Sequence, residues 1–353
     1  MKELELRQID IACIMKPHNI AYLAGYAPVC AGVLFFRHEE PLFCTLWLDA
    51  QEAKRFCRIS QLVTYRFPRE KLMGKMLNAI KKKELQPKRI AVEKDFMLLR
   101  DYDAFNAEFP EAEYVDITPC IDRLRAIKSK EEIENIRRSA AISDRAMMAA
   151  LQAVKPGVSE LDIAAEAEYV MKKSGSDRPA FSTFVASGER TLLAHPIASQ
   201  RKIRQGEAVV VDLGATYQGY ASDICRTTFA GDATSDQLNY LRTIVRGQES
   251  GARALRDGVP CSEIYNAVYG VFRIAGIEKF LPEDIGYGVG LRQSEFYPVI
   301  EKGNHTILKE NMVVALLQTT SFSAKVGGLR VEDTYHVTAT GAEKLTKHQQ
   351  PLF

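Results

Sequence analysis

The sequence predicts two domains, a layered α/β domain followed by an α+β domain. Three observations support this fold class. The chain has 353 residues, about twice the usual size of one domain, so two separate cores are expected. Short β-rich segments alternate with helical ones up to about Thr118, and mostly strand-like segments follow Ala180. We place the domains at residues 1–122 and 123–353.

The first domain contains segments with alternating strand and helix character. Two segments, Ala50–Cys57 and Arg69–Lys83, have the apolar spacing of helices. The segments expected to form strands are rich in β-branched and aromatic residues: Ile9–Ile14, Val29–Phe36, Leu42–Leu48, Arg89–Val92 and Glu113–Ile117. This alternation is typical of an α/β layer structure.

The second domain begins with two helices. Helical spacing of apolar residues extends over Ser129–Val154, and the Lys155-Pro156-Gly157 sequence ends it. Ser159 and Asp162 have the spacing of a capping box, which opens a helix that ends near Gly175. The later segments are two helices (Asp236–Arg256, Ser262–Ala275) and six expected strands (Phe181–Ala186, Ala208–Leu213, Tyr220–Phe229, Gly286–Gly290, Met312–Gln318, Leu329–Thr338).

Composition and charge exclude several classes of protein. The apolar content is 46% and the charged content 26%, as in ordinary globular proteins, and the net charge of +2 is too small to attract nucleic acid. No segment has the apolar length of a signal peptide core or a membrane span, so we expect a cytoplasmic protein without a membrane partner. Seven cysteines without a CxxC pair indicate neither a disulfide framework nor a zinc knuckle.

The strongest candidate for a site is a hairpin that carries two aspartates. Strand-like segments around Asp212 and Asp223 flank a turn near Gly219. With the turn centred between Tyr217 and Gln218, Asp212 and Asp223 pair directly, and their Cβ atoms lie about 5 Å apart on one face. Two carboxylates this close repel each other, which a native site relieves with a cation or a shared proton.

A solvent-exposed hairpin is the alternative interpretation of this pair. In that case the two aspartates only make the hairpin soluble. The Val209-Val210-Val211 sequence before Asp212 is more typical of a buried strand, which favours a functional site.

Several motifs together resemble the creatinase/prolidase/Xaa-Pro aminopeptidase family. Asp212-x-Gly-Ala and Ser-Asp223-x-x-Arg-Thr are similar to the segments that hold the family's first two metal ligands. Further similar segments are Asn19–Tyr26, Leu124–Ile133, Phe184–Gly188 with Ala-His195-Pro, and Gly328-Leu-Arg330-Val-Glu332-Asp333. The resemblance implies a creatinase-like N-terminal domain followed by a pita-bread C-terminal domain, with His195 as the upstream active-site histidine.

The chain departs from the family's pattern at its metal ligands. The family's Gly-His-Gly-x-Gly-Leu is Gly286-Tyr287-Gly288-Val289-Gly290-Leu291 here, so a tyrosine replaces the metal-binding imidazole. Ser294-Glu295 replaces a His-Glu pair, and Leu317, followed by Gln318, replaces a glutamate. The ligands that remain are Asp212, Asp223 and Glu332, so we expect no resident cofactor, or at most one Mn²⁺ or Mg²⁺ ion on the three carboxylates.

Three functions fit this set of residues. The first is a metal-independent or weakly metal-assisted hydrolase of a C–N bond in a small amino-acid derivative or short Xaa-Pro-like peptide. In it, His195 transfers protons, and Asp212, Asp223 and Glu332 bind a cationic group. Further residues expected in this pocket are Tyr287, Glu295 and Arg330.

The other two functions use the same fold differently. The second is a metal-dependent Xaa-Pro peptidase in which Glu295, Gln318 or Tyr287 replaces a missing ligand. The third is a non-catalytic binding protein, because a fold does not determine a function. The resemblance also implies a homodimer, since family members close the active site with the N-terminal domain of a neighbour.

Overall fold

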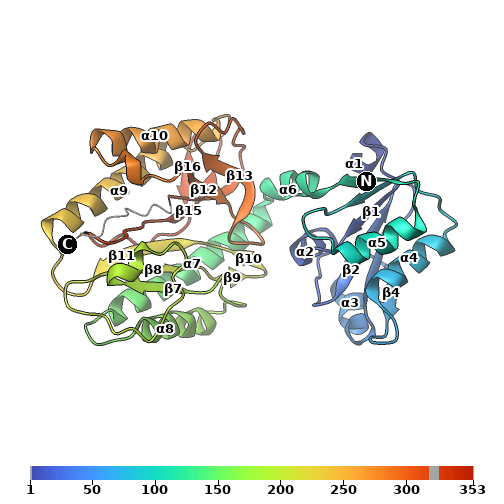
Figure 1. Ribbon diagram of the computed structural model, residues 1–353, viewed down its shortest axis with the longest axis horizontal. Coiled ribbons are helices and arrows are strands. Elements are labelled where there is room, and N and C mark those ends of the chain that lie inside the picture. Colours follow the sequence, from blue (N-terminus) through green and yellow to red (C-terminus); the bar gives the residue numbers. More distant parts are fainter. Residues whose placement is uncertain (1, 318–325, 353) are drawn as a thin grey trace. The chain divides into compact units, whose positions relative to one another are not determined.

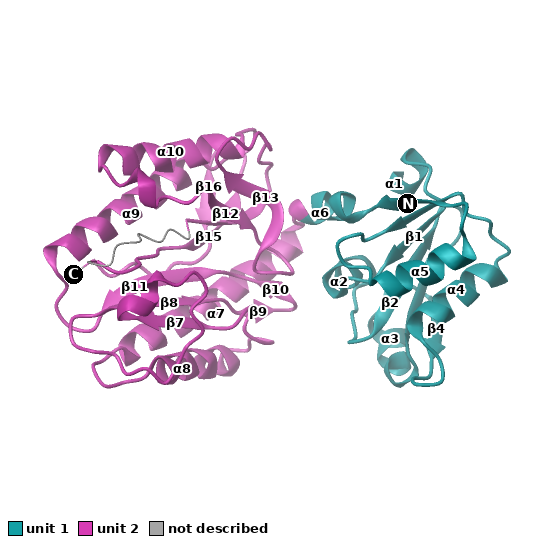
Figure 2. Cartoon of the chain, in the orientation of Figure 1, with its two compact units in different colours: residues 1–125 teal, residues 126–353 magenta. Residues whose placement is uncertain are grey.

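The computed structural model describes residues 2–317 and 326–352. The chain forms two compact units, Met1–Arg125 (unit 1) and Ala126–Phe353 (unit 2), shown in different colours in Figure 2. This division lies three residues beyond the expected boundary after residue 122. Gln318, expected as a substitute ligand, lies outside the described residues.

Unit 1 contains one six-stranded mixed sheet with the order β4-β3-β2-β1-β5-β6 (Figure 1). β1 pairs antiparallel with β2 and parallel with β5, and β3 pairs parallel with β4. Parallel neighbours need crossover connections, which the helices of the unit supply. The strands are β1 (Ile11–Ile14), β2 (Ala31–Phe36), β3 (Leu42–Leu46), β4 (Gln61–Tyr65), β5 (Arg89–Val92) and β6 (Glu113–Asp116).

Both faces of this sheet are buried. In β1, Ile11 and Cys13 pack in one apolar cluster, whereas Ala12 and Ile14 pack in another. Alternate residues of a strand point to opposite faces, so helices cover the sheet on both sides, as the α/β class requires. The helices are α1 (Lys2–Leu6), α2 (Pro17–Ala24), α3 (Ala50–Phe56), α4 (Leu72–Lys82), α5 (Leu99–Glu108), and α6 (Thr118–Ala126), which crosses the boundary; η1 (Trp47–Asp49) is a short 3-10 turn.

The described part of unit 2 contains two antiparallel sheets with a pair of helices packed against each. The sheets have the orders β11-β8-β7 and β13-β12-β14-β15-β16, and β9 with β10 forms a small ribbon. The strands are β7 (Phe184–Ser187), β8 (Ala208–Leu213), β9 (Thr216–Tyr217), β10 (Tyr220–Ala221), β11 (Ile224–Phe229), β12 (Asp284–Gly288), β13 (Glu295–Glu301), β14 (Val313–Leu316), β15 (Asp333–Val337) and β16 (Ala342–Lys344). This arrangement confirms the predicted α+β class.

The two helix pairs of unit 2 follow from amphipathic sequences. Apolar residues of α7 and α8 pack against β8, and apolar residues of α9 and α10 pack against β14 and β15. Capping boxes begin α7 at Ser129 and α8 at Ser159, which confirms the capping box predicted from Ser159 and Asp162. The bounds are α7 (Lys130–Ala153), α8 (Glu160–Lys173), α9 (Ser235–Ala254) and α10 (Cys261–Ile274), with 3-10 turns η2 (Gly188–Leu192) and η3 (Glu278–Phe280).

Several elements were not expected from the sequence. These are the helices α1, α2, α5 and α6 and the strands β4, β13 and β16. β13 contains Pro298, a residue that argues against a strand when only the sequence is read. Among the described residues, no helix has the length and hydropathy needed to cross a membrane.

Candidate active site

A tight turn sets the register of the hairpin that carries both aspartates. Gln218 and Gly219 have φ angles of 50° and 80°, and Tyr217 pairs with Tyr220 around them. Two central residues with positive φ form the turn type that matches the twist of a hairpin, and glycine adopts this conformation without strain. The predicted turn, centred between Tyr217 and Gln218, is therefore wrong.

The corrected register keeps both aspartates on one face of the sheet. Asp212 pairs with Cys225 and not with Asp223. Cys225 lies two residues after Asp223, and a shift of two residues along a strand preserves the face to which a side chain points. The two aspartates are therefore diagonal neighbours and not a direct pair. Their side chains still converge, because both point to the same face of the sheet.

The hairpin opens where Asp223 lies. Gly214 and Ser222 leave the ladder there, and a Cβ atom on Gly214 would lie 2.1 Å from the carbonyl oxygen of Ser222. Thr334 of β15 holds the backbone of Asp223, because its hydroxyl accepts from the amide of Asp223 at 2.9 Å and donates to the carbonyl at 2.8 Å. This tie fixes Asp223 to the segment that carries the third carboxylate.

Glu332 joins the site through a bridge to β11. Cys225 and Glu332 exchange backbone hydrogen bonds of 3.1 and 3.0 Å, so Asp212, Cys225 and Glu332 form a row across three neighbouring segments. Ligand oxygens of Asp212, Asp223 and Glu332 lie within 4.8 Å of one another, and all three residues are buried. We call these three residues the carboxylate cluster.

Burial and mutual repulsion dominate the electrostatics of this cluster. Burial raises the pKa of Asp223 and of Glu332 well above their usual values, and the neighbouring carboxylates raise both further. Among the described residues, Oδ1 of Asp223 and both carboxylate oxygens of Glu332 are buried without a hydrogen bond of acceptable geometry. Such oxygens favour a bound cation, because an unpaired buried charge is costly.

Tyr287 occupies the position of the imidazole ligand and donates a hydrogen bond. Its hydroxyl donates to Oδ2 of Asp223 at 2.8 Å, and Gln293 Nε2 donates to the same oxygen at 3.0 Å. Burial and the nearby carboxylates raise the pKa of Tyr287 well above its usual value, so the phenol stays neutral. The sequence interpretation missed Gln293, although it follows Tyr287 by only six residues.

Neither Glu295 nor Leu317, the residue in place of the family's glutamate, belongs to the carboxylate cluster, and Gln318 lies outside the described residues. Leu317 is buried in the apolar core formed with α9 and α10. Glu295 forms a buried ion pair with Lys128, with Nζ and Oε2 3.4 Å apart, and it is not part of the carboxylate cluster. A buried leucine offers no lone pair to a metal ion.

His195 and Arg330 lie in segments tied to each other. The guanidinium of Arg330 is buried and donates to the carbonyl oxygens of Leu193 and Ala194, the residues before His195. His195 is exposed, and its ring centroid lies 5.9 Å from that of Phe184, the direct β-partner of Asp212. Their predicted roles in proton transfer and substrate binding stay predictions.

The chemistry of the donors fits one hard cation. Three carboxylates with oxygens close together are the ligands that Mn²⁺ and Mg²⁺ prefer. A second ion would lack two ligands, because Tyr287 is a neutral phenol and Leu317 is an alkyl group. The described residues therefore fit a site for one ion better than a site for two.

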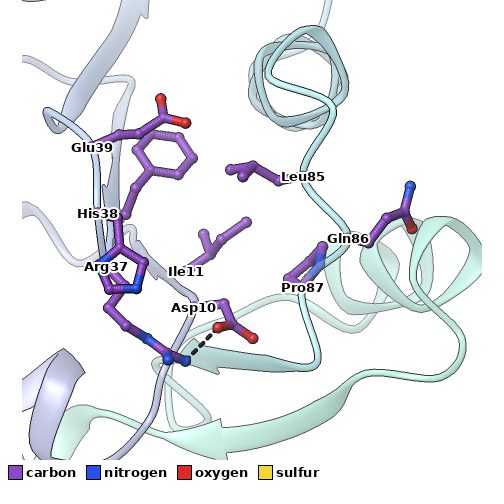
Figure 3. A pocket seen from close by; sticks show the side chains of 9 residues that line it. Asp10, Ile11, Arg37, His38, Glu39, Leu85, Gln86 and Pro87 are labelled. Carbon is purple, nitrogen blue, oxygen red and sulfur yellow. Dashed lines mark hydrogen bonds and ion pairs between the residues drawn. The ribbon is translucent and has the colours of Figure 1, made fainter.

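A cavity also lies in unit 1, away from this cluster. Figure 3 shows this cavity, with a volume of about 130 Å³, where Asp10 accepts from Arg37 beside His38 and Glu39. The carboxylate of Asp10 also accepts from the amides of Lys88 and Arg89, so its role is explained by the fold.

Comparisons with known proteins agree with this architecture. Residues 1–127 match the family described as "Creatinase/Prolidase N-terminal domain". Residues 134–339 match the family described as "Metallopeptidase family M24". A Xaa-Pro dipeptidase from Pyrococcus furiosus is 32% identical over 352 residues, which cover 100% of this chain and 97% of that protein. A putative dipeptidase from Bacillus subtilis, YkvY, is 28% identical and covers 97% of this chain and 94% of that protein.

Solved structures give the same result. The prolidase from Pyrococcus horikoshii OT3 has a TM-score of 0.92 and 29% identity, with 100% of this chain and 98% of that chain covered. A Xaa-Pro dipeptidase from Bacillus anthracis has a TM-score of 0.92 and 26% identity, with 99% and 96% covered. These findings confirm the predicted creatinase-like and pita-bread domains and the prediction of a hydrolase. The chain therefore belongs to metallopeptidase family M24 and carries the creatinase/prolidase N-terminal domain.

Proposed function

We propose that this hydrolase cleaves the C–N bond of a short Xaa-Pro-like peptide and that the carboxylate cluster holds one divalent cation such as Mn²⁺ or Mg²⁺ for this reaction. The substrate class follows the names of its relatives, a Xaa-Pro dipeptidase and prolidases. The restriction to one cation follows from this chain's own residues. This proposal refines the reaction expected from the sequence, which was metal-independent or only weakly metal-assisted.

One observation carries the proposal. Asp212, Asp223 and Glu332 come from three different segments, and their ligand oxygens lie within 4.8 Å of one another in a fully buried cluster. Three carboxylates are not kept this close for stability, because burial and repulsion both oppose it. A bound positive charge removes this cost, and surrounding oxygens suit a hard ion.

The reaction then assigns a role to each group. When bound, a hard cation polarises the scissile carbonyl and lowers the pKa of a coordinated water. Asp212, Asp223 and Glu332 hold that charge in place, while Tyr287 fixes the orientation of Asp223 through its hydrogen bond. In this proposal His195 gives a proton to the leaving nitrogen, for which its exposed position near Phe184 is suitable.

The test combines a substrate panel with metal analysis. Chelator-treated protein is assayed on Xaa-Pro dipeptides and on matched dipeptides without proline, before and after stepwise addition of Mn²⁺. We expect cleavage of the Xaa-Pro substrates to rise until one equivalent is bound and then to level off. Activity that requires two equivalents overturns the restriction to one cation.

Two other outcomes distinguish the remaining functions. Cleavage that is unchanged in chelator supports the metal-independent reaction. In that reaction the three carboxylates bind a cationic group of the substrate. Binding of Xaa-Pro peptides without cleavage under any metal condition identifies a non-catalytic binding protein. Asp212→Asn is the matched variant, because it keeps the size of the side chain and removes its charge.

We also propose that the protein acts as a homodimer. This proposal is supported by the match of residues 1–127 to the creatinase/prolidase N-terminal domain. Sedimentation velocity at micromolar concentration should show a species of twice the 39.5 kDa chain mass. A monomer at that concentration contradicts it.

A further inference from the structure

Two neutral side chains donate hydrogen bonds to the same oxygen of the carboxylate cluster. The hydroxyl of Tyr287 and Nε2 of Gln293 both donate to Oδ2 of Asp223, at 2.8 and 3.0 Å. Gln293 Nε2 also lies 2.9 Å from the hydroxyl of Tyr287, to which it donates. The three groups form a closed triangle in which the phenol oxygen accepts one hydrogen bond and gives another.

We propose that Tyr287 and Gln293 together replace a second cation at Asp223 and hold the site to a single ion. The inference rests on the proposed function, because it assumes that the carboxylate cluster binds a cation. It goes further by assigning a role to Gln293, a residue that no resemblance singled out. It also explains how Asp223 is stabilised on the side where a ligand to a second ion is missing.

The backbone brings Gln293 back to Tyr287. Tyr287 lies in β12, and the pairing with β13 shifts after it, from Tyr287 opposite Val299 to Gly288 opposite Glu295. The connection between the strands therefore turns back sharply, and the amide of Gly290 donates to the carbonyl of Arg292 at 3.0 Å within this turn. Gln293 follows directly and reaches the side of Asp223 where Tyr287 donates.

The ion pair between Glu295 and Lys128 lies next to this turn. A Cβ atom on Gly290 would lie 2.6 Å from Oε1 of Glu295, so a larger residue there would push that carboxylate aside. Glu295 forms its buried ion pair with Lys128, which lies just before α7. The pair gives Glu295 a structural role and keeps it out of the cluster, in which it was expected as a substitute ligand.

The triangle acts against a second ion in two ways. An ion on Oδ2 of Asp223 would have to displace two hydrogen bonds that form to a charged oxygen, which are stronger than neutral ones. It would then meet a neutral phenol at Tyr287, and Leu317, which replaces a glutamate of the family's pattern, lies in the apolar core and offers no ligand atom. The other oxygen of Asp223, Oδ1, accepts no hydrogen bond among the described residues and is left for the first ion.

The test measures Mn²⁺ stoichiometry in the wild type, two variants of the site and one control variant. Equilibrium dialysis and electron paramagnetic resonance are applied to the wild type, to Tyr287→His, and to Tyr287→His combined with Gln293→Leu. The spectrum separates isolated Mn²⁺ from coupled pairs and does not depend on activity. Gln61→Leu, an exposed change in β4 of unit 1, is the matched control for the loss of a glutamine amide.

The expected results follow from the two donors. The wild type and Gln61→Leu bind one ion and give the spectrum of isolated Mn²⁺. Tyr287→His binds a second ion weakly, because Gln293 still donates to Asp223. Adding Gln293→Leu tightens the second ion by about tenfold, the effect of removing one hydrogen bond to a charged oxygen that the ion would otherwise displace.

Each contrary result has a separate meaning. Two tightly bound ions in the wild type overturn the inference and the single-ion function together. Equal affinity for the second ion with and without Gln293→Leu overturns the inference and leaves the single-ion function intact. No bound ion in the wild type, with a native circular dichroism spectrum, rejects the cation itself and the inference with it.

Discussion

Arg226→Met is expected to destabilise unit 2 by about 3–5 kcal/mol, the usual cost of removing one partner from a buried ion pair. The side chains of Arg226 and Asp333 are both 0% exposed, and they lie 2.6 Å apart. Arg226 also donates to the carbonyl oxygens of Cys225 and Glu332, at 2.8 and 2.7 Å, and to that of His348. Methionine fills much of the volume but donates none of these hydrogen bonds.

The remaining partners of Asp333 place the expected loss at the lower end of this range. Asp333 keeps three further donors (Gln248, Lys344 and Thr346), so its charge is not left without partners. The loss should therefore be close to 3 kcal/mol, which lowers the melting temperature of a unit of this size by roughly 6–12 °C. The matched control is Arg137→Met, which breaks an ion pair whose side chains are 36% and 39% exposed and should cost less than about 1 kcal/mol.

Urea unfolding followed by two signals separates the units. Trp47 is the only tryptophan and lies in unit 1, so its fluorescence reports that unit, whereas circular dichroism at 222 nm reports the helices of both. We expect Arg226→Met to shift the circular dichroism transition and leave the Trp47 transition in place. If Arg226→Met costs no more than Arg137→Met, the reasoning from burial is refuted.

Three further changes have defined outcomes. Gly219→Ala should lower the free energy of unfolding by about 1 kcal/mol or more, because φ is +80° there and alanine adopts this conformation with strain. Glu207→Gln tests a pH dependence: the hydrogen bond from Arg201 holds the pKa of Glu207 below its usual value. A lowered folded-state pKa contributes stability above the unfolded pKa of about 4.3, so the wild type's advantage over this variant should shrink as pH falls below that value. Arg330→Met should raise amide exchange around His195 by about tenfold or more and slow turnover, because the guanidinium no longer binds the two preceding carbonyls.

Controls make these three measurements decisive. Gly270→Ala lies within α10 with no atom near the added Cβ, so it should be neutral or stabilising, unlike Gly219→Ala. A constant difference between Glu207→Gln and the wild type from pH 7 to pH 3 would show that Glu207 has no lowered pKa. For Arg330→Met, unchanged exchange around His195 would disprove the link between the two segments.

The layers and the face on which the aspartates lie could be predicted from residue periodicity. Val209 and Val211 point toward α7 and α8, so Asp212 must point the other way, and this parity follows from the period of a strand. Because a two-residue error preserves parity, the convergence of Asp212 and Asp223 was predicted even though the register was wrong. The replacements at Tyr287 and Leu317 could also be read directly, because they are changes of residue type within motifs.

Which groups meet, and which carboxylate oxygens accept hydrogen bonds, depends on contacts between distant elements. The bridge between Cys225 and Glu332 joins residues more than a hundred positions apart, and no local pattern specifies such a pair. Cys225 was overlooked for this reason, although it lies in the middle of the row. Arg330 has the strand period of Glu332, yet its guanidinium reaches the carbonyls of Leu193 and Ala194 and not the cluster.

The return of Gln293 to Asp223 depends on a turn and a register shift between β12 and β13, which arise from packing around Gly290 and Glu295. Sequence periodicity describes one element at a time, because it records only the direction in which each side chain leaves its own backbone. Contacts between elements depend on how the backbone folds back, so the hydrogen bonds that complete this site could be found only in three dimensions.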